Sequence, residues 1–260
     1  MEITLPKAPK IKEQSENRAV FVIEDLYPGY GVTLGNSLRR TLYSSLPGAA
    51  ITQVKIKGTT HEFSVLPGVL EDILEITLNL KQIHIKLHSE EMQTATIKVK
   101  GVREVKAGDM EVPSQVEVIN KDAHIATLTS KDAVFDLELT IEAGLGYVAV
   151  EHQKKERIEI GSIPLDAIYT PVVKVNFEVE NMRVGDRTDY NRLILEVVTN
   201  GTISPVEALR YSSNLLVKHF EVSGDIAEEA KPKKLESAKK EKKVKSEKKK
   251  SGATKKTNKK

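Results

Sequence analysis

Residues 28–48 have the sequence PGYGVTLGNSLRRTLYSSLPG, which predicts a turn followed by a helix. Glycine and proline at 28–31 are typical of a turn, and a helix is predicted from Thr33 to Leu46. The apolar positions that recur every four residues along it are Leu34, Leu38, Leu42 and Leu46. Thr33 is the predicted N-cap, and Pro47-Gly48 is predicted to end the helix. Because the leucines form one stripe, the helix is expected to pack along a single face.

Two adjacent arginines, Arg39 and Arg40, lie on this predicted helix. At about 100° per residue, Arg40 falls nearly opposite the leucine stripe, whereas Arg39 flanks it. Arg40 is therefore expected to project outward from a well-anchored helix. Two interpretations fit this position: a solvated surface arginine, or a charged anchor for a partner protein, a role in which arginine is over-represented.

The segments around this helix have a different period. Residues 17–26 are predicted to form a strand, and from 48 to about 171 apolar residues mostly alternate with polar ones. Such alternation is typical of half-buried antiparallel strands. One helix is predicted to interrupt them near 69–80, where Val69, Ile73, Ile76 and Leu80 have helical spacing. Alternation returns at 173–179, and 193–198 is predicted as a buried strand, so the whole chain is predicted to be α+β.

The last predicted helix begins at Ser204-Pro205-Val206-Glu207, a capping box with proline at the first helical position, and runs to about Phe220. One apolar stripe consists of Val206, Leu209, Leu216, Val217 and Phe220, and Ala208, Ser212 and Leu215 lie on roughly the other side. A helix with two such sides usually packs against two neighbours. One is expected to be its own sheet, and the other is either a partner subunit or the interior of the same domain.

The formal net charge of +3 is unevenly distributed along the 260 residues. Residues 231–260 contain fifteen lysines and three glutamates, a net charge of +12, which leaves −9 for residues 1–230. An acidic body is not expected to be a general phosphate-binding surface. The lysine-rich tail has almost no apolar residues to bury and is predicted to be disordered.

Motifs that would carry chemistry are weak. GYGVTLG at 29–35 is close to a dinucleotide-binding loop, but its spacing is one residue off. The parallel strand that such a unit needs, ending in an acidic residue, is missing. The chain has no cysteine, its histidines show no ligand spacing on a common helix face, and no aspartate cluster suggests a two-metal centre. The sequence therefore predicts no catalytic, cofactor-binding or metal site in this chain.

Five longer blocks, in order, carry more information than any single motif. They are GYGVTLGNSLRRTLYSSLPGAAIT (29–52), HEFSVLPGVLEDILEITLNLK (61–81), GLGYVAV (144–150), IPLDAIYTPVVKVNFEVE (163–180) and RVGDRTDYNRLILEVVTNGTISPVEAL (183–209). They are distributed along residues 17–222. In this order they resemble the alpha subunit of bacterial-type DNA-directed RNA polymerase, in its N-terminal half.

The resemblance implies a homodimeric assembly scaffold without catalytic residues of its own. It implies a dimerising α/β domain, 1–47 with 172–224, interrupted by an inserted β-rich domain, 48–171, and followed by the tail, 225–260. The dimer would use the first and last helices of each chain. The residues implied at the dimer interface are Leu34, Leu38, Leu42, Leu46, Leu209, Ser212, Leu215 and Leu216.

The resemblance also implies two large partners, since one copy would engage the beta subunit and the other the beta-prime subunit. The implied beta contacts are Arg40, Asn36, Glu71 and Asp72. The beta-prime contacts would fall in the later part of the inserted domain and near 183–201. Magnesium and zinc are expected in other subunits of the enzyme. Because no apolar run reaches the length of a membrane span and the N-terminus has no signal-peptide pattern, a soluble intracellular protein is expected. The resemblance further implies the cytoplasm, close to the nucleoid.

The resemblance implies a further, C-terminal DNA-binding domain in family members, and the lysine-rich tail is expected to stand in its place here. DNA would then be reached through the complex, or by nonspecific phosphate contacts of the tail. The candidate DNA contacts are Lys239, Lys240, Lys242, Lys243, Lys248, Lys249 and Lys250. The alternative is a tail that only increases solubility.

Overall fold

The computed structural model describes residues 3–59, 63–153 and 161–224, and all strand pairs within them are antiparallel. Its buried apolar side chains form two main clusters. One cluster draws on residues between 19 and 46 and between 172 and 209. The other draws only on residues between 51 and 165. The chain therefore builds one core from its two outer segments and a second core from its middle.

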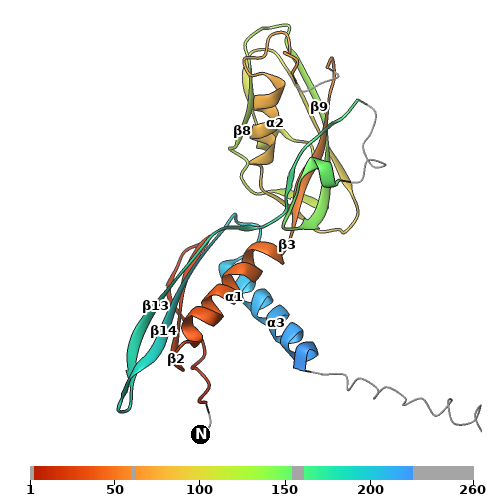
Figure 1. Ribbon diagram of the computed structural model, residues 1–260. Helices are drawn as coiled ribbons and strands as arrows, with labels where there is room; N and C mark the ends of the chain where they lie inside the picture. The colour runs from red at the N-terminus through yellow and green to blue at the C-terminus, as the bar shows by residue number, and fades with distance from the viewer. Residues whose placement is uncertain (1–2, 60–62, 154–160, 225–260) are drawn as a thin grey trace, which may run out of the picture. The chain divides into compact units, whose positions relative to one another are not determined.

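The first core lies against a four-stranded sheet with the order β1-β2-β14-β13 (Figure 1). Its strands are β1 (Lys10–Gln14), β2 (Arg18–Leu26), β13 (Val172–Val184) and β14 (Arg187–Thr199). Helices α1 (Tyr30–Ser44) and α3 (Pro205–Gly224) contribute to the same cluster. On β14 the buried positions Leu193, Leu195 and Val197 alternate, so one face of the strand meets this core.

The second core lies inside the β-rich middle of the chain. Its main sheet has the order β5-β9-β3-β4-β7, with β11 paired to β3, and two further pairs are β6-β8 and β10-β12. The strands are β3 (Pro47–Ile56), β4 (Ile85–Leu87), β5 (Gln93–Lys100), β6 (Arg103–Lys106), β7 (Val116–Val118), β8 (His124–Leu128), β9 (Val134–Leu145), β10 (Tyr147–Val148), β11 (Ile163–Pro164) and β12 (Ala167–Ile168). Two 3-10 turns lie at Ala107–Asp109 and Val150–His152. Helix α2 (Ile73–Lys81) completes this core with the fully buried Ile73, Ile76 and Leu80.

Most of the predicted elements are confirmed. The strand predicted at 17–26 is β2, and the alternating segments include β5, β9 and β13. The capping box of α3 is formed: Glu207 N donates to Ser204 Oγ at 3.3 Å, and Ser204 N donates to Glu207 Oε2 at 3.3 Å. The α+β composition follows, with the β-rich part in the middle of the chain.

Several predicted boundaries were wrong. Helix α1 begins at Tyr30, three residues before the expected N-cap Thr33, whose hydroxyl instead donates to Gly29 O at 3.3 Å. Helix α2 begins only at Ile73, because Val69 pairs with Leu128 and Asp72 caps the helix by accepting from Glu75 N at 2.7 Å. Helix α1 ends at Ser44, before Pro47-Gly48, and α3 continues to Gly224.

Candidate subunit interface

The N-terminus of α1 is held by a side chain from another element. Oδ1 of Asn191 on β14 accepts hydrogen bonds from the backbone N–H groups of Gly29, at 2.9 Å, and Gly31, at 3.3 Å. Asn191 is only 8% exposed, so this cap lies inside the chain. A dinucleotide-binding loop would direct such N–H groups at a phosphate. Their internal use argues against the nucleotide interpretation of residues 29–35.

The glycines of α1 serve close packing rather than phosphate binding. A Cβ atom on Gly31 would lie 2.7 Å from Cγ1 of Val179, and one on Gly35 would lie 2.6 Å from Cδ2 of Phe177. Both distances are far inside the optimal separation of two carbon atoms, about 3.5–4.0 Å. Helix α1 therefore lies on β13 at a depth that a larger residue would prevent.

This anchored helix exposes Asn36, Arg39 and Arg40 on its outer side. Its inner side is fixed by Leu38 and Leu42, which are 3% and 0% exposed. The guanidinium groups of Arg39 and Arg40 have no ion-pair or hydrogen-bond partner in the part of the chain that the structure describes. The predicted outward position of Arg40 is confirmed, whereas its contact with a partner stays a prediction. A cation on a rigid helix suits recognition of an acidic group on another protein.

Most residues implied at the dimer interface are already buried within the single chain. Five of them are 0–7% exposed: Leu38, Leu42, Leu46, Leu209 and Ser212. The other three, Leu34, Leu215 and Leu216, are half-buried. Because the buried leucines join the sheet-facing core, they offer almost no surface to a second copy. A dimer contact through them stays a prediction that their burial does not favour.

Helix α3 exposes other apolar side chains. Tyr211 and Val217 are 44% and 54% exposed, and Phe220 and Val222 are 65% and 74% exposed. The last apolar residues of the stripe predicted along this helix, Val217 and Phe220, are thus not covered by its own sheet. Val217 and Phe220 lie on one side of the helix, and Tyr211 and Val222 lie roughly opposite. Exposed apolar side chains that gather on one side of a helix are typical of a surface that meets another protein.

The two carboxylates implied as beta contacts have internal roles instead. Glu71 is 6% exposed, and its Oε2 accepts from Thr127 N at 2.7 Å while its Oε1 lies 2.9 Å from Nε2 of His124. Burial raises the pKa of Glu71, but the hydrogen bonds from Thr127 and His124 outweigh it and hold that pKa below its ordinary value. Asp72 is exposed but occupied as the N-cap of α2. Glu71 therefore fastens this loop to β8, and its direct contact with a partner stays a prediction that its burial does not favour.

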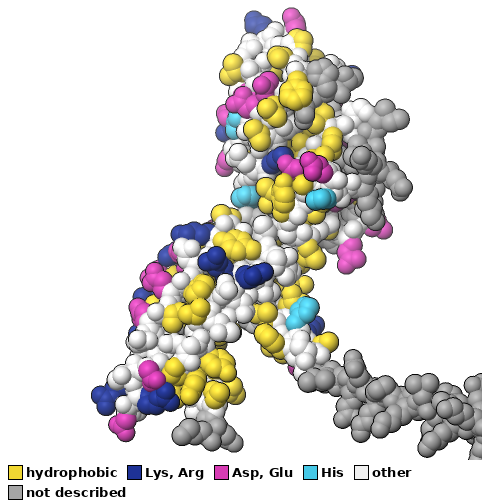
Figure 2. All heavy atoms as spheres, in the orientation of Figure 1, with side chains coloured by type: hydrophobic (Ala, Val, Ile, Leu, Met, Phe, Trp, Pro, Cys, Tyr) yellow, Lys and Arg dark blue, Asp and Glu magenta, His cyan; other side chains and the backbone are white. Residues whose placement is uncertain are grey.

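An exposed apolar surface lies beside these carboxylates. Its members are Phe63, Val65, Leu70, Leu74 and Leu78, which are 78%, 69%, 70%, 44% and 50% exposed. We call this group the 63–78 surface. Leu74 and Leu78 share one face of α2, and an isolated bridge between Val65 and Asp72 ties the preceding loop to the start of that helix. In Figure 2, apolar side chains appear at the surface of the upper part of the view, where Figure 1 shows α2.

Comparison with known proteins places the chain in a family. Residues 54–170 match the family described as "RNA polymerase Rpb3/RpoA insert domain". A DNA-directed RNA polymerase subunit alpha from Alkaliphilus oremlandii is 48% identical over 221 residues, which are 85% of this chain and 69% of that protein. The subunit alpha of Syntrophomonas wolfei is 49% identical over 216 residues, 83% of this chain and 68% of that protein. That of Roseiflexus is 44% identical over 235 residues, 89% and 72% of the two chains.

The chain belongs to the family of RNA polymerase alpha subunits. The resemblance seen in the five sequence blocks is confirmed by these matches, and the function is that of an alpha subunit in transcription. The enzyme concerned, DNA-directed RNA polymerase, is a nucleotidyltransferase of several subunits.

One missed feature of this alpha subunit is an arginine held between two tyrosines. The Arg187 guanidinium carbon lies 5.4 Å from the ring centroids of both Tyr27 and Tyr190, and Arg187 forms two hydrogen bonds to Asp189, at 3.0 and 2.7 Å. Hydrogen bonds to Asp189 and Tyr27 raise the pKa of Arg187 above its ordinary value. Tyr27 also packs edge-on to Tyr30, the first residue of α1. This cluster connects the β13–β14 hairpin to the start of the helix that carries Arg40.

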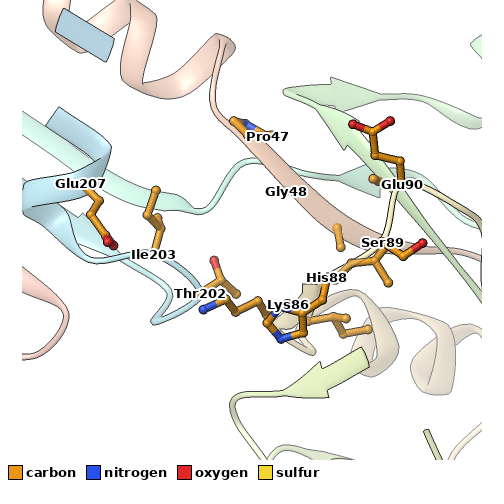
Figure 3. A pocket seen from close by; sticks show the side chains of 13 residues that line it. Pro47, Gly48, Lys86, His88, Ser89, Glu90, Thr202, Ile203 and Glu207 are labelled. Carbon is orange, nitrogen blue, oxygen red and sulfur yellow. The ribbon is translucent and has the colours of Figure 1, made fainter. Parts of the chain in front are cut away.

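A hollow of about 530 Å³ is lined by residues of β3, β4 and β9 and by Thr202, Ile203 and Glu207 (Figure 3). In Figure 3, Glu207 and Glu90 lie on opposite sides of the view, with Lys86, His88 and Thr202 between them. Glu207 is committed to the α3 capping box, and His88 Nε2 lies 3.5 Å from Glu117. The hollow therefore lacks the nucleophile–base geometry of an enzyme site.

Among the residues that the structure describes, no group of three or more histidines and acidic residues could hold a metal ion. No helix in the described ranges is long and apolar enough to cross a membrane. The candidate DNA-binding lysines, Lys239 to Lys250, lie outside the described residues.

Proposed function

We propose that the protein is a homodimeric scaffold that nucleates assembly of the beta and beta-prime subunits for DNA-templated transcription. Family membership gives the general role, and the two separate cores support a division into a dimerisation domain, 1–47 with 172–224, and an inserted domain, 48–171. A two-fold dimer offers two identical surfaces, on which two different large subunits dock. The observation that carries the proposal is the exposed Arg40 on the deeply anchored helix α1, whose guanidinium has no partner among the described residues.

The dimer contact is proposed to involve the later turns of α3, between Leu215 and Phe220. The buried leucines of α1 fix that helix on its own sheet, so they act by setting its position. Val217 and Phe220 remain available on α3, together with the half-buried Leu215 and Leu216. A second copy that covered these side chains would bury apolar area at about 25 cal/mol per Å².

Negative charge placed at Val217 and Phe220 is expected to separate the dimer. In the double variant Val217→Asp, Phe220→Asp, an interface that buries both positions would have to desolvate two carboxylates, at a cost of several kcal/mol. Sedimentation velocity should then show a monomer where the unchanged protein gives a dimer. The control is Lys218→Asp, an exposed position on the same helix that adds charge without replacing an apolar residue. A double variant that stays dimeric would exclude Val217 and Phe220 from the contact.

The beta subunit is proposed to dock through Arg40, with Asn36, and through the 63–78 surface. Arg40 supplies a charge that can pair with a carboxylate, and the 63–78 surface supplies exposed apolar area. Asp72 lies next to this surface, whereas Glu71 supports it from inside. Co-purification of the beta subunit with the tagged chain, compared with an Arg40 variant, tests this proposal.

The beta-prime subunit is proposed to contact the later part of the inserted domain and residues near 183–201. Exposed apolar side chains in these parts of the chain include Leu145, Tyr147 and Ile168. The magnesium and zinc of the enzyme are proposed to lie in other subunits, and the complex is proposed to work in the cytoplasm, on the nucleoid.

A second proposed role concerns the tail, whose net charge of +12 follows from the sequence. We expect truncation after residue 230 to lower the affinity for nonspecific duplex DNA at low salt, because lysines release counterions from the phosphates. For the complete chain, affinity should fall by roughly tenfold or more between 50 and 200 mM salt. Fluorescence anisotropy with a labelled duplex measures both effects. If the truncated chain binds as well as the complete one, the tail has only a solubilising role.

A further inference from the structure

His124, the first residue of β8, lies between two carboxylates from different elements. Its Nε2 is 2.9 Å from Oε1 of Glu71, in the loop before α2, and its Nδ1 is 3.1 Å from Oε1 of Glu104 on β6. A neutral imidazole has one donor and one acceptor nitrogen, so it can donate to only one carboxylate and turns a lone pair toward the other. The doubly protonated ring donates to both. The geometry therefore fits the charged form of His124.

The other charged groups near Glu71 and Glu104 do not take the place of His124 as the partner of these two carboxylates. Lys106 Nζ lies 3.8 Å from Oε2 of Glu104, a loose contact on β6 itself. Arg103, on the same strand, is hydrogen-bonded to Asp109. Burial lowers the pKa of the His124 imidazole, but the hydrogen bonds to Glu71 and Glu104 outweigh it and raise that pKa above its ordinary value.

The same contacts fix the loop that carries the 63–78 surface. Glu71 joins His124 on one side and Thr127 N on the other, and Leu70 N donates to Thr127 O at 2.9 Å. Leu70, 70% exposed, is the residue immediately before Glu71. Its position relative to β8 therefore depends on whether the Glu71 carboxylate stays engaged.

We propose that His124 is a protonation-dependent latch that holds the 63–78 surface in its docking conformation. This inference rests on the proposed function, because the latch would regulate the 63–78 surface, which is proposed above to bind the beta subunit. The imidazolium closes the latch by binding Glu71 and Glu104 together. Loss of its proton leaves one carboxylate facing a ring lone pair and loosens the loop at Leu70.

The direction of the pH effect follows from the raised pKa of His124. A group whose pKa is higher in the folded chain stabilises the fold fully below its unfolded pKa, about 6.5 for histidine. That stabilisation is lost as the pH rises through the folded pKa. The latch is accordingly closed in mildly acidic solution and opens on the alkaline side of the folded pKa.

The test combines a titration with a binding measurement on the complete chain. The His124 ring resonances are followed by NMR against pH, in the unchanged protein and in Glu71→Gln, which has nearly the same shape without the charge. Affinity for the purified beta subunit is then measured between pH 6 and 9 for the unchanged protein and for His124→Gln. His88→Gln is the matched control, because His88 also lies beside a carboxylate, Glu117 at 3.5 Å, on β7.

We expect the titration midpoint of His124 to lie above that of an exposed histidine and to fall in Glu71→Gln. The ratio of the affinities of the unchanged protein and His124→Gln should decrease by about two- to fivefold as the pH rises, as expected of a partly exposed pair. The same ratio for His88→Gln should not change with pH. This control accounts for any pH response of the beta subunit itself, because that response is common to all the proteins compared. A midpoint unaffected by Glu71→Gln, or a flat ratio for His124→Gln, overturns the latch. If the beta subunit binds neither protein at any pH while the midpoint is still raised, the proposed docking function is wrong, and the regulatory role is wrong with it.

Discussion

Replacing Arg40 by glutamate is expected to abolish capture of the beta subunit while leaving the alpha subunit folded. Arginines at the centre of protein interfaces contribute about 2–4 kcal/mol when truncated, and charge reversal adds repulsion from the acidic group that Arg40 would meet. We therefore expect the affinity to fall at least about 30-fold. Because Arg40 is exposed and unpaired within the described chain, the free energy of unfolding should change by no more than about 0.5 kcal/mol.

The measurement is co-purification of the beta subunit with tagged chain, in salt high enough to suppress binding through the lysine tail. Arg39→Glu is the control, since it makes the same charge change one position earlier on α1, about 100° around the helix. Weak loss for Arg39→Glu and complete loss for Arg40→Glu would locate the contact. If both variants capture the beta subunit as well as the unchanged chain does, Arg40 is not the contact and the contact lies outside α1. The family assignment would not be affected.

Local sequence patterns predicted the elements of this fold well, because each is encoded within a few residues. The capping box Ser204–Glu207 brings its partners together within one helical turn, and the alternation of β9 needs only the neighbouring strands to be half-buried. The exposure of Arg40 followed from its angle to the leucine stripe. These inferences need no knowledge of distant contacts.

The errors arose where a distant residue decides the local structure. The start of α1 is set by Asn191, which lies some 160 residues away in sequence. Val69 resembles a helical position, but pairing with Leu128 removes it from α2. Val173 continues the apolar alternation of its neighbours yet is 60% exposed, because the β13–β14 register shifts between Val172 and Lys174. No periodicity reports such contacts.

The candidate site shows the same limit. Glu71 lies in a sequence block for which the resemblance implies a contact with the beta subunit. Its observed hydrogen-bonding partner, His124, lies on β8, and only the fold brings the two residues together. The clamp on Arg187 likewise needs Tyr27, from the other end of the chain. A polar residue such as Asn191 beside a predicted buried strand was the available signal. It indicates that an internal hydrogen-bond partner exists, but it does not identify that partner.

Adding one methyl group at Gly35 is expected to destabilise the fold, although the same change stabilises most helices. In an exposed helix interior, alanine is favoured over glycine by about 1 kcal/mol. Here the new Cβ would lie 2.6 Å from Cδ2 of Phe177 and 3.0 Å from Cδ1 of Leu193, so α1 must lift from the sheet or these side chains must shift. Overpacking of this kind costs about 1–3 kcal/mol.

Thermal unfolding of Gly35→Ala should therefore show a Tm lowered by about 3–10 °C. The control is Gly224→Ala at the end of α3, where a Cβ atom would meet nothing within 4 Å, and its Tm should be unchanged. Because α1 carries Arg40, the lifted helix should also bind the beta subunit less tightly at temperatures well below the transition. A Gly35→Ala protein as stable as the unchanged chain would show that α1 has room to adjust, and that the depth of its packing does not set the position of Arg40.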